Sequence, residues 1–231
     1  ALNPEIGSRD DFEHFVRTLR AHGMGQIFDM VPNHMGVMGA DNAWWMDVLE
    51  NGEASVYAGY FDIDWQPVEL VLSGKVLVPV LGNHYGVVLE QGELRLTFET
   101  GRGAFSICYH EHRFPIDPGS YCRILERALK LAPPQELLPA ARNEFESLIS
   151  AFGHLPARRE TAAGTCAERN RDKEVHKKRL AALVAGQPAL AAGIEAALRA
   201  INGTPRERAS FDALNALLEA QAYRLAYWRV T

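Results

Sequence analysis

The first apolar stripe of the chain has the spacing of a helix. Ser8 can cap its start, and Asp11 follows three residues later in a short-armed form of the capping box. His22-Gly23 supplies a C-terminal stop, so the pattern predicts a helix between Ser8 and His22 with one buried face. The residues of that face are Phe12, Phe15, Val16 and Leu19.

Residues 25–31 form a short apolar run that is interrupted by Asp29. Such a run after a helix predicts a buried parallel strand of an α/β protein. Pro32 would end the hydrogen-bonded ladder, and Asn33 and His34 follow it. Because ligands meet the carboxyl ends of strands in α/β folds, these two side chains are candidates for a binding site.

Between Phe61 and Phe114 the pattern changes to short alternating runs, which are separated by hairpin and loop signals. These runs predict a small antiparallel β region. They are VELVL (68–72), KVLVPVL (75–81), ELRLTFE (93–99) and AFSICYH (104–110).

The C-terminal half has the pattern of amphipathic helices. Helix starts are expected after Ser120 and after Pro133-Pro134, and residues 202–205 close one helix and open another. The stripe of the last helix extends over residues 211–225. This half is therefore expected to be mostly helical.

The charge pattern argues against nucleic acid and membrane partners. The 231 residues carry a net charge of -5, which gives no overall basic field. No apolar stretch reaches the ~20 residues of a spanning helix. Residues 157–179 are the most charged stretch, but no aromatic residues interleave with the charge to stack bases. We expect a solvated helix face there, with a mobile loop through residues 162–164.

The cysteines and histidines give no sign of a metal site. Cys108, Cys122 and Cys166 are an odd number without a C-x-x-C pair, which argues against both a disulfide framework and a zinc knuckle and fits a reducing cytoplasm. His110 and His112 share one side of a predicted strand, but two ligands without a third make a poor metal site. The chain opens in loop-like sequence without an initiator methionine and closes inside an apolar pattern. We therefore expect an internal fragment of a longer cytoplasmic protein.

The segment GSRDDFEHFVRTLRAHGMGQIFDMVPNHMG, residues 7–36, resembles the third βα step of the α-amylase clan of glycoside hydrolases. The first signature of that clan has the form Asp-x-Val-x-Asn-His. The resemblance implies a (β/α)8 barrel in which Asp29 pairs with an Arg on the next strand. His34 would donate a ring N–H to the sugar at the bond being broken, and Asn33 would order the loop or bind calcium. With one carboxylate nearby we expect no calcium, and we expect no cofactor.

Further segments resemble the maltooligosyl trehalose synthase family of the same clan. They are residues 42–65, 75–99, 109–125 and 221–230. The resemblance implies a partial barrel edge in residues 1–38, an insertion with short antiparallel strands in 39–118, and a helical subdomain in 119–231 that returns toward the barrel. The expected fold class is α/β, a partial (β/α)8-barrel edge with an antiparallel β subdomain and a large α-helical insertion.

The resemblance also implies an activity. The family rearranges the reducing-end α-1,4 bond of a maltooligosaccharide into an α,α-1,1 bond in trehalose biosynthesis, by retaining glycosidase chemistry. That chemistry needs a carboxylate nucleophile and a carboxylic acid about 5–5.5 Å apart. In the clan the nucleophile Asp follows an Arg two residues earlier on the fourth strand, and no apolar strand of this chain contains R-x-D. We expect both carboxyl groups to lie outside this chain and the fragment alone to be inactive.

Aromatic and loop residues are further candidates for contacts with a maltooligosaccharide or another α-1,4-glucan. Trp44 and Trp45 could stack on sugar rings, although adjacent tryptophans often include one core anchor. His84 and Tyr85 stand in a Gly-flanked loop, which favours exposure and a sugar contact.

Other functions remain open at this point. Within the clan, a plain amylase or a maltooligosyl trehalose trehalohydrolase is the nearest alternative. A non-catalytic carbohydrate-binding module would explain the aromatic residues without catalytic carboxylates, and a helical scaffold is supported by the C-terminal half alone. The incomplete edge strand after the first helix also predicts dimerisation through that edge.

Overall fold

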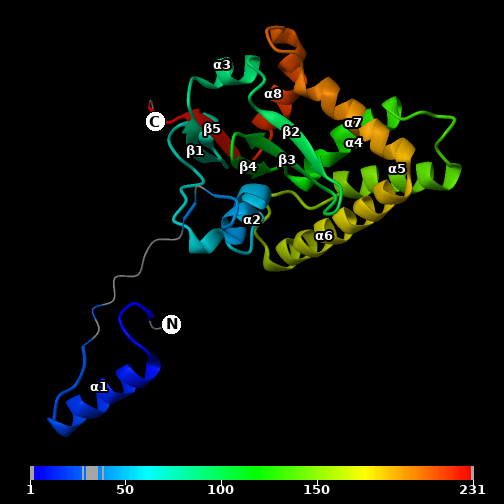
Figure 1. The fold of residues 1–231 in the computed structure, drawn as a ribbon. Coiled ribbons are helices and arrows are strands. Elements are labelled where there is room, and N and C mark those ends of the chain that lie inside the picture. Colours follow the sequence, from blue (N-terminus) through cyan, green and yellow to red (C-terminus); the bar gives the residue numbers. More distant parts are fainter. Residues whose placement is uncertain (1–2, 28, 30–35, 38, 230–231) are drawn as a thin grey trace. The chain divides into compact units, whose positions relative to one another are not determined.

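The computed structural model describes residues 3–27, 29, 36–37 and 39–229. The chain divides into two compact units, Ala1–Met35 and Gly36–Thr231, and each is described by itself. Figure 1 colours the first unit dark blue and the second from lighter blue to red. Every buried hydrophobic side chain in the described ranges lies in the second unit.

The first unit contains helix α1, Arg9–Ala21, whose ends are set by side-chain chemistry. The Ser8 hydroxyl accepts from the Asp11 amide at 3.2 Å, and the Asp11 carboxylate accepts from the Ser8 amide at 2.8 Å. Hydrogen bonds from Ser8 also lower the pKa of the Asp11 carboxyl. Gly23 has a φ of +67°, the left-handed conformation that stops a helix. The predicted capping box and helix end are confirmed.

The burial predicted for this unit is wrong for the residues described. Helix α1 buries none of its side chains, and Phe15 is 51% exposed. Residues 25–27 and Asp29 lie outside any strand, and Asp29 is exposed. A buried parallel strand needs a neighbouring strand and covering helices, whereas the described part of this unit offers α1 alone. The barrel edge is therefore not confirmed.

The second unit is mixed α/β. Its α-helices are α2 (Ala43–Asn51), α3 (Tyr85–Glu90), α4 (Tyr121–Leu131), α5 (Pro139–Gly153), α6 (Ala163–Gly186), α7 (Pro188–Asn202) and α8 (Asp212–Glu219). Its strands are β1 (Val76–Leu81), β2 (Arg95–Glu99), β3 (Ala104–Tyr109), β4 (His112–Pro115) and β5 (Tyr223–Tyr227). Short 3-10 turns are η1 (Gly52–Ala54), η2 (Ala58–Tyr60), η3 (Leu70–Leu72), η4 (Pro118–Ser120) and η5 (Arg208–Phe211).

These elements confirm the α/β class and the helical bias of the chain. The structure is 53% helical, and its described residues form no closed barrel. Within the same residues no single helix is long and apolar enough to cross a membrane, although α6 and α7, bent by 111° at their junction, pass that test as a pair.

Strands β2, β3 and β4 form the antiparallel sheet that the alternating runs predict. Strand β1 departs from the prediction, because it pairs in parallel with β5 in a separate two-stranded sheet. The register aligns Val76 with Tyr223 and Val78 with Leu225, and all four side chains are buried. The two strands are far apart in the sequence, so alternation within either strand cannot reveal their pairing.

The prediction of a strand at VELVL, residues 68–72, is wrong. Its last three residues form turn η3, and Val68 and Leu70 are 98% and 85% exposed. The Gly74 amide donates to the Trp65 carbonyl at 2.8 Å, which closes this segment into a loop instead of a ladder.

The last helix ends earlier than its predicted stripe, which extended to residue 225. Helix α8 ends at Glu219, and the residues beyond it enter strand β5. The buried Gln221 side chain donates to the Leu217 carbonyl at 2.6 Å and accepts from the Asp117 amide at 2.8 Å. These two hydrogen bonds hold the chain where the helix stops and the strand begins.

Helices α4 to α7 carry much of the core and lie together beside the β2–β3–β4 sheet (Figure 1). Helix α4 starts directly after Ser120, and α7 ends at Asn202 before Gly203, as the sequence predicts. Helix α5 starts at Pro139, later than the signal at Pro133-Pro134 suggests, because Pro at the first helical position is itself a start signal.

Gly193 of α7 sets the distance between α7 and α4. A Cβ at this position would lie 2.5 Å from the Ala128 carbonyl oxygen and 2.9 Å from the Ala132 Cβ. We predict that Gly193→Ala lowers the free energy of unfolding by about 1–3 kcal/mol, because the helices must move apart. Urea denaturation measures this loss. Gly164→Ala in α6 is the matched control, since its Cβ would meet open space, and an equal loss in both variants would contradict the prediction.

Candidate functional site

The two polar candidates of the signature, Asn33 and His34, lie outside the described residues. Asp29 is described, and its exposure differs from the buried position that its predicted role requires. The described structure resumes at Gly36, whose carbonyl accepts from the Asn42 side chain at 2.7 Å. Gly36 is therefore held to the start of α2 within the second unit.

Helix α2 turns its two adjacent tryptophans in different directions. Asn42 caps the helix by accepting from the Trp45 amide at 3.1 Å. Trp45 is 8% exposed and its ring lies 5.0 Å from the Phe61 ring, so it is the core anchor of the pair. Trp44 is 39% exposed and can meet a ligand.

Trp44 forms a cluster with Tyr57 and Tyr60 that we call the aromatic surface. The rings of Trp44 and Tyr57 are stacked, with centroids 5.0 Å apart and 10° between their planes. The Tyr60 ring is tilted by 49° to that of Trp44 at 5.0 Å, and Tyr60 is 65% exposed. Of the three residues of the aromatic surface, the sequence identified only Trp44 as a candidate. The two tyrosines belong to irregular turns whose spacing carries no periodic signal.

His84 and Tyr85 lie at the start of α3 in different environments. His84 is exposed, as the loop signals predict, and its ring stands edge-on to the Tyr227 ring at 5.2 Å. The Tyr85 hydroxyl is hydrogen-bonded to Asn215 Oδ1 at 2.8 Å, and burial raises the pKa of Tyr85. Tyr85 therefore fixes α3 to α8 through its hydroxyl, while the imidazole of His84 faces solvent.

The histidine pair considered for a metal is not a pair on one strand. His110 stands in the turn between β3 and β4 with a φ of +48°, and its Nε2 lies 3.5 Å from the Glu93 carboxylate. His112 begins β4. Among the residues that the structure describes, no three His, Cys, Asp or Glu side chains are grouped to hold a metal ion.

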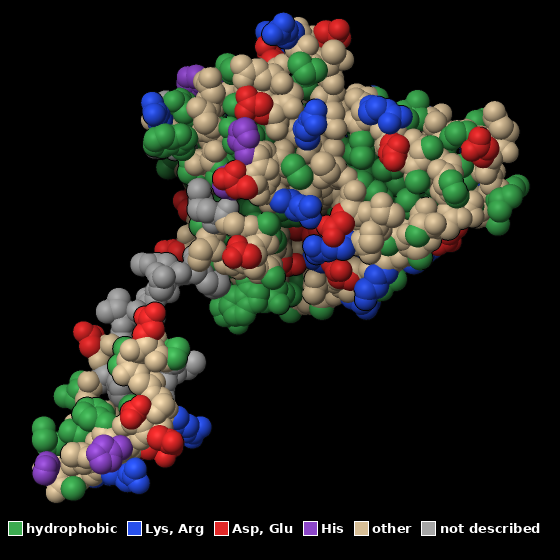
Figure 2. Space-filling model, viewed as in Figure 1, with side chains coloured by type: hydrophobic (Ala, Val, Ile, Leu, Met, Phe, Trp, Pro, Cys, Tyr) green, Lys and Arg blue, Asp and Glu red, His purple; other side chains and the backbone are tan. Residues whose placement is uncertain are grey.

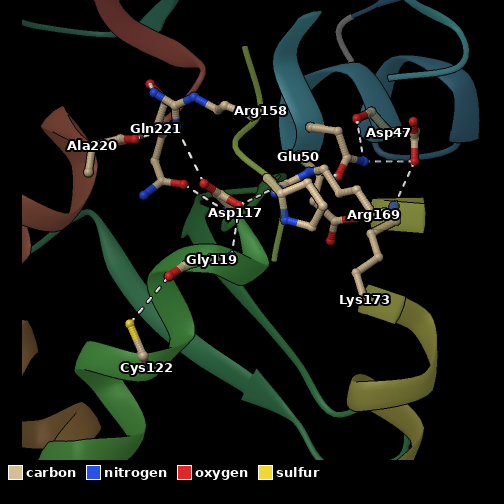
Figure 3. A network of polar contacts seen from close by, with 12 residues as sticks. Asp47, Glu50, Asp117, Gly119, Cys122, Arg158, Arg169, Lys173, Ala220 and Gln221 are labelled. Atoms are coloured by element: carbon tan, nitrogen blue, oxygen red, sulfur yellow. Dashed lines mark hydrogen bonds and ion pairs between the residues drawn. The ribbon is translucent and has the colours of Figure 1, made fainter. Parts of the chain in front are cut away.

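A cluster of charged side chains joins α2 to α6 in the interior (Figure 3). Lys173 Nζ lies 2.8 Å from Asp47 Oδ1 and 2.7 Å from Glu50 Oε2. Lys177 Nζ lies 2.5 Å from Glu50 Oε1. We call these four residues the ion cluster. Buried charges are tolerated when they are paired and hydrogen-bonded, and each member has a partner of opposite sign.

Arg169 on the same face of α6 extends these contacts toward β5 (Figure 3). Its Nη2 lies 2.5 Å from Asp117 Oδ1. Arg158 lies 3.6 Å from the other oxygen of Asp117 and donates to the carbonyls of Ala220 and Gln221. Two arginines therefore share one carboxylate and fix the segment that enters β5.

The solvated helix face predicted for residues 157–179 is wrong for three of its cations, and the loop expected at 162–164 is instead the start of α6 at Ala163. The three cations recur every four residues, and Leu180 and Val184 continue the same buried face. This spacing, together with the carboxylates of α2, is the signal that would have revealed the cluster. The buried cations are Arg169, Lys173 and Lys177.

A cleft of about 420 Å³ opens beside the ion cluster, between α2, the β2–β3 hairpin and α6. Figure 2 shows side chains of both charge signs intermixed over this region. They are paired with one another, as in the 2.8 Å contact of Arg113 with Glu99. The cleft can therefore offer hydrogen bonds to hydroxyl groups without a strong field of one sign.

Glu50 makes the stability of the ion cluster depend on pH. Burial would raise the pKa of its carboxyl, but Lys177 and Lys173 outweigh burial and lower the pKa from 4.5 to about 2. The stability that Glu50 contributes is complete above pH 4.5 and is lost as the pH falls toward 2. We predict that the free energy of unfolding, measured by urea denaturation, falls over this range.

Glu50→Gln is the control for this pH dependence. It should lose about 3–5 kcal/mol of stability at neutral pH, because Lys177 keeps no buried carboxylate partner and Lys173 keeps one. Its stability should then fall less steeply on acidification than that of the unmodified chain. Parallel pH profiles for the two proteins would contradict the role of Glu50.

No protein-family model and no solved structure match the chain. Two curated proteins of Mycobacterium tuberculosis, from strains CDC 1551 / Oshkosh and ATCC 25618 / H37Rv, are each 38% identical to it over 111 residues. Both carry the name "Putative maltooligosyl trehalose synthase".

The match covers 44% of this chain and 14% of each relative, so the chain spans a small part of the length of the curated proteins it matches. The resemblance that the motifs predict is confirmed over that part: the chain is similar to members of the maltooligosyl trehalose synthase family.

Proposed function

We propose that this chain is part of a maltooligosyl trehalose synthase, which converts the reducing-end α-1,4 bond of a maltooligosaccharide into an α,α-1,1 bond. The observation that carries the proposal is the 38% identity over 111 residues to two proteins of that name. The Asp-x-Val-x-Asn-His signature supports it separately, because that pattern is a known sugar-site motif of the α-amylase clan.

In such an enzyme, this chain would bind and orient the glucan. Trp44 offers an exposed ring and His84 an exposed imidazole, while the cleft beside the ion cluster offers paired polar groups. The signature residues Asn33 and His34 precede α2 in the sequence, and within the second unit the Asn42 side chain donates to the Gly36 carbonyl. Positioning of this kind supports catalysis by holding the substrate near its reactive geometry.

The chemical step needs groups that we assign to the remainder of the enzyme. A retaining mechanism uses a nucleophile and an acid about 5–5.5 Å apart, in a closed site that excludes water. None of the described strands contains R-x-D. His34 would hydrogen-bond the sugar where charge develops, and Asp29 would be buried once a neighbouring strand supplied its Arg.

The first prediction from this proposal concerns the chain alone. Incubated with maltohexaose, the 231-residue polypeptide should form neither maltooligosyl trehalose nor shorter maltodextrins, because binding groups without a nucleophile and an acid cannot split the bond. Chromatography of the sugars measures this. Product from a clean preparation would show that the chain holds its own catalytic carboxylates.

The second prediction concerns His34 in the complete enzyme. His34→Ala should lower turnover roughly ten- to hundredfold, which corresponds to the ~1–3 kcal/mol of a lost transition-state hydrogen bond. Turnover and KM are measured separately, with His14→Ala on the exposed face of α1 as the control. Unchanged turnover in a folded variant would leave His34 a structural residue.

The products of the complete enzyme test the family assignment itself. Trehalose-ended products support the mutase, and glucose or maltose alone would indicate another hydrolase of the clan. Saturable glucan binding without any turnover would indicate a carbohydrate-binding module.

A further inference from the structure

The aromatic surface is a group of packed rings that remains partly exposed in the second unit. Figure 2 shows hydrophobic side chains exposed beside α2. Exposed aromatic rings are costly in water, and grouped rings on a surface commonly mark a place where something binds. Tyr60 is the most open of the three rings, since it is 65% exposed while Trp44 is 39% exposed.

A chain of polar contacts connects this surface to α6. Lys173 Nζ lies 2.8 Å from Asp47 Oδ1, and the other oxygen of Asp47 accepts from the Ser55 hydroxyl at 2.6 Å. The Ser55 oxygen in turn accepts from the Tyr57 amide at 3.1 Å. The Tyr57 ring stacks on Trp44 at 5.0 Å. The buried ion cluster therefore holds the backbone that carries the aromatic surface.

We propose that the aromatic surface stacks on the glucose rings of an α-1,4-glucan, with Tyr60 as the main contact and Lys173 as a positioning residue. This inference rests on the proposed function and names further residues of the same binding region. A pyranose ring has apolar C–H faces and a hydroxyl edge. One tryptophan and two tyrosines present apolar ring faces with polar groups at their edges. Such a surface suits a sugar, which also has apolar faces and polar edges, better than it suits a purely aliphatic ligand.

The proposal is tested by titrating maltoheptaose into the 231-residue chain and measuring affinity by calorimetry. Tyr60→Ala should weaken binding about tenfold, as expected for loss of one aromatic contact. Val68→Ala is the matched control, because Val68 is 98% exposed in a different loop, and it should leave the affinity unchanged. Absence of saturable binding, or equal affinities of the unmodified chain and Tyr60→Ala, would overturn the proposal.

The positioning role of Lys173 needs variants that separate it from stability. Lys173→Met removes the charge, Lys173→Arg keeps it, and Ser55→Ala cuts the contact chain beyond the ion cluster. We expect Lys173→Met and Ser55→Ala to weaken maltoheptaose binding severalfold and Lys173→Arg to restore most of it. Folding of each variant is checked by circular dichroism. If Lys173→Met fails to fold, Ser55→Ala decides, and its unchanged affinity in a folded chain would overturn the positioning role.

These results separate the inference from the proposed function. A complete enzyme that makes trehalose-ended products, with a normal KM in Tyr60→Ala, would refute the aromatic surface and leave the mutase standing. Tyr60-dependent maltoheptaose binding by this chain, with no mutase activity in the complete enzyme, would support the aromatic surface and refute the proposed mutase function.

Discussion

The buried ion cluster between α2 and α6 connects the charged interior of the second unit to its candidate site. Taking charged groups out of water costs several kcal/mol for each ion, and close pairing must offset that cost. Here Lys173 contacts Asp47 and Glu50 together, and Lys177 contacts Glu50. Because each buried charge needs a partner of opposite sign, we infer that the cluster restricts the position of α2 against α6 more than apolar contacts would.

The contacts of the ion cluster affect both the fold and the candidate site. The buried face of α6 changes from cations at its N-terminal half to Leu180 and Val184 further on, so one helix joins the charged interior to the apolar core. Arg169 continues the contacts to Asp117 and so to the segment that enters β5. At the other end of the cluster, Asp47 accepts from the Ser55 hydroxyl and so holds the turns that carry the aromatic surface.

The sequence predicts well the features that neighbouring residues determine. Ser8 and Asp11 mark the start of α1 because the capping box is local, and the turns between β2, β3 and β4 mark an antiparallel sheet for the same reason. The parallel pairing of β1 with β5 depends on the whole intervening chain, which no local pattern records. The Gly-flanked loop predicted the exposure of His84, but the sequence did not say which of Trp44 and Trp45 is buried. Tyr57 and Tyr60 join Trp44 only through tertiary structure.

The buried cations of α6 were missed for a different reason: Lys and Arg are rarely buried, so their spacing of four suggests solvent unless the carboxylates of α2 are known to face them. Amide hydrogen exchange in Lys173→Met tests the central role of this cluster most directly. If the ion cluster fixes α2, the amides of α2 and of the turns after it should lose protection while those of α4 and α7 keep theirs. Unchanged protection in α2, or an equal loss in all helices, would contradict that role.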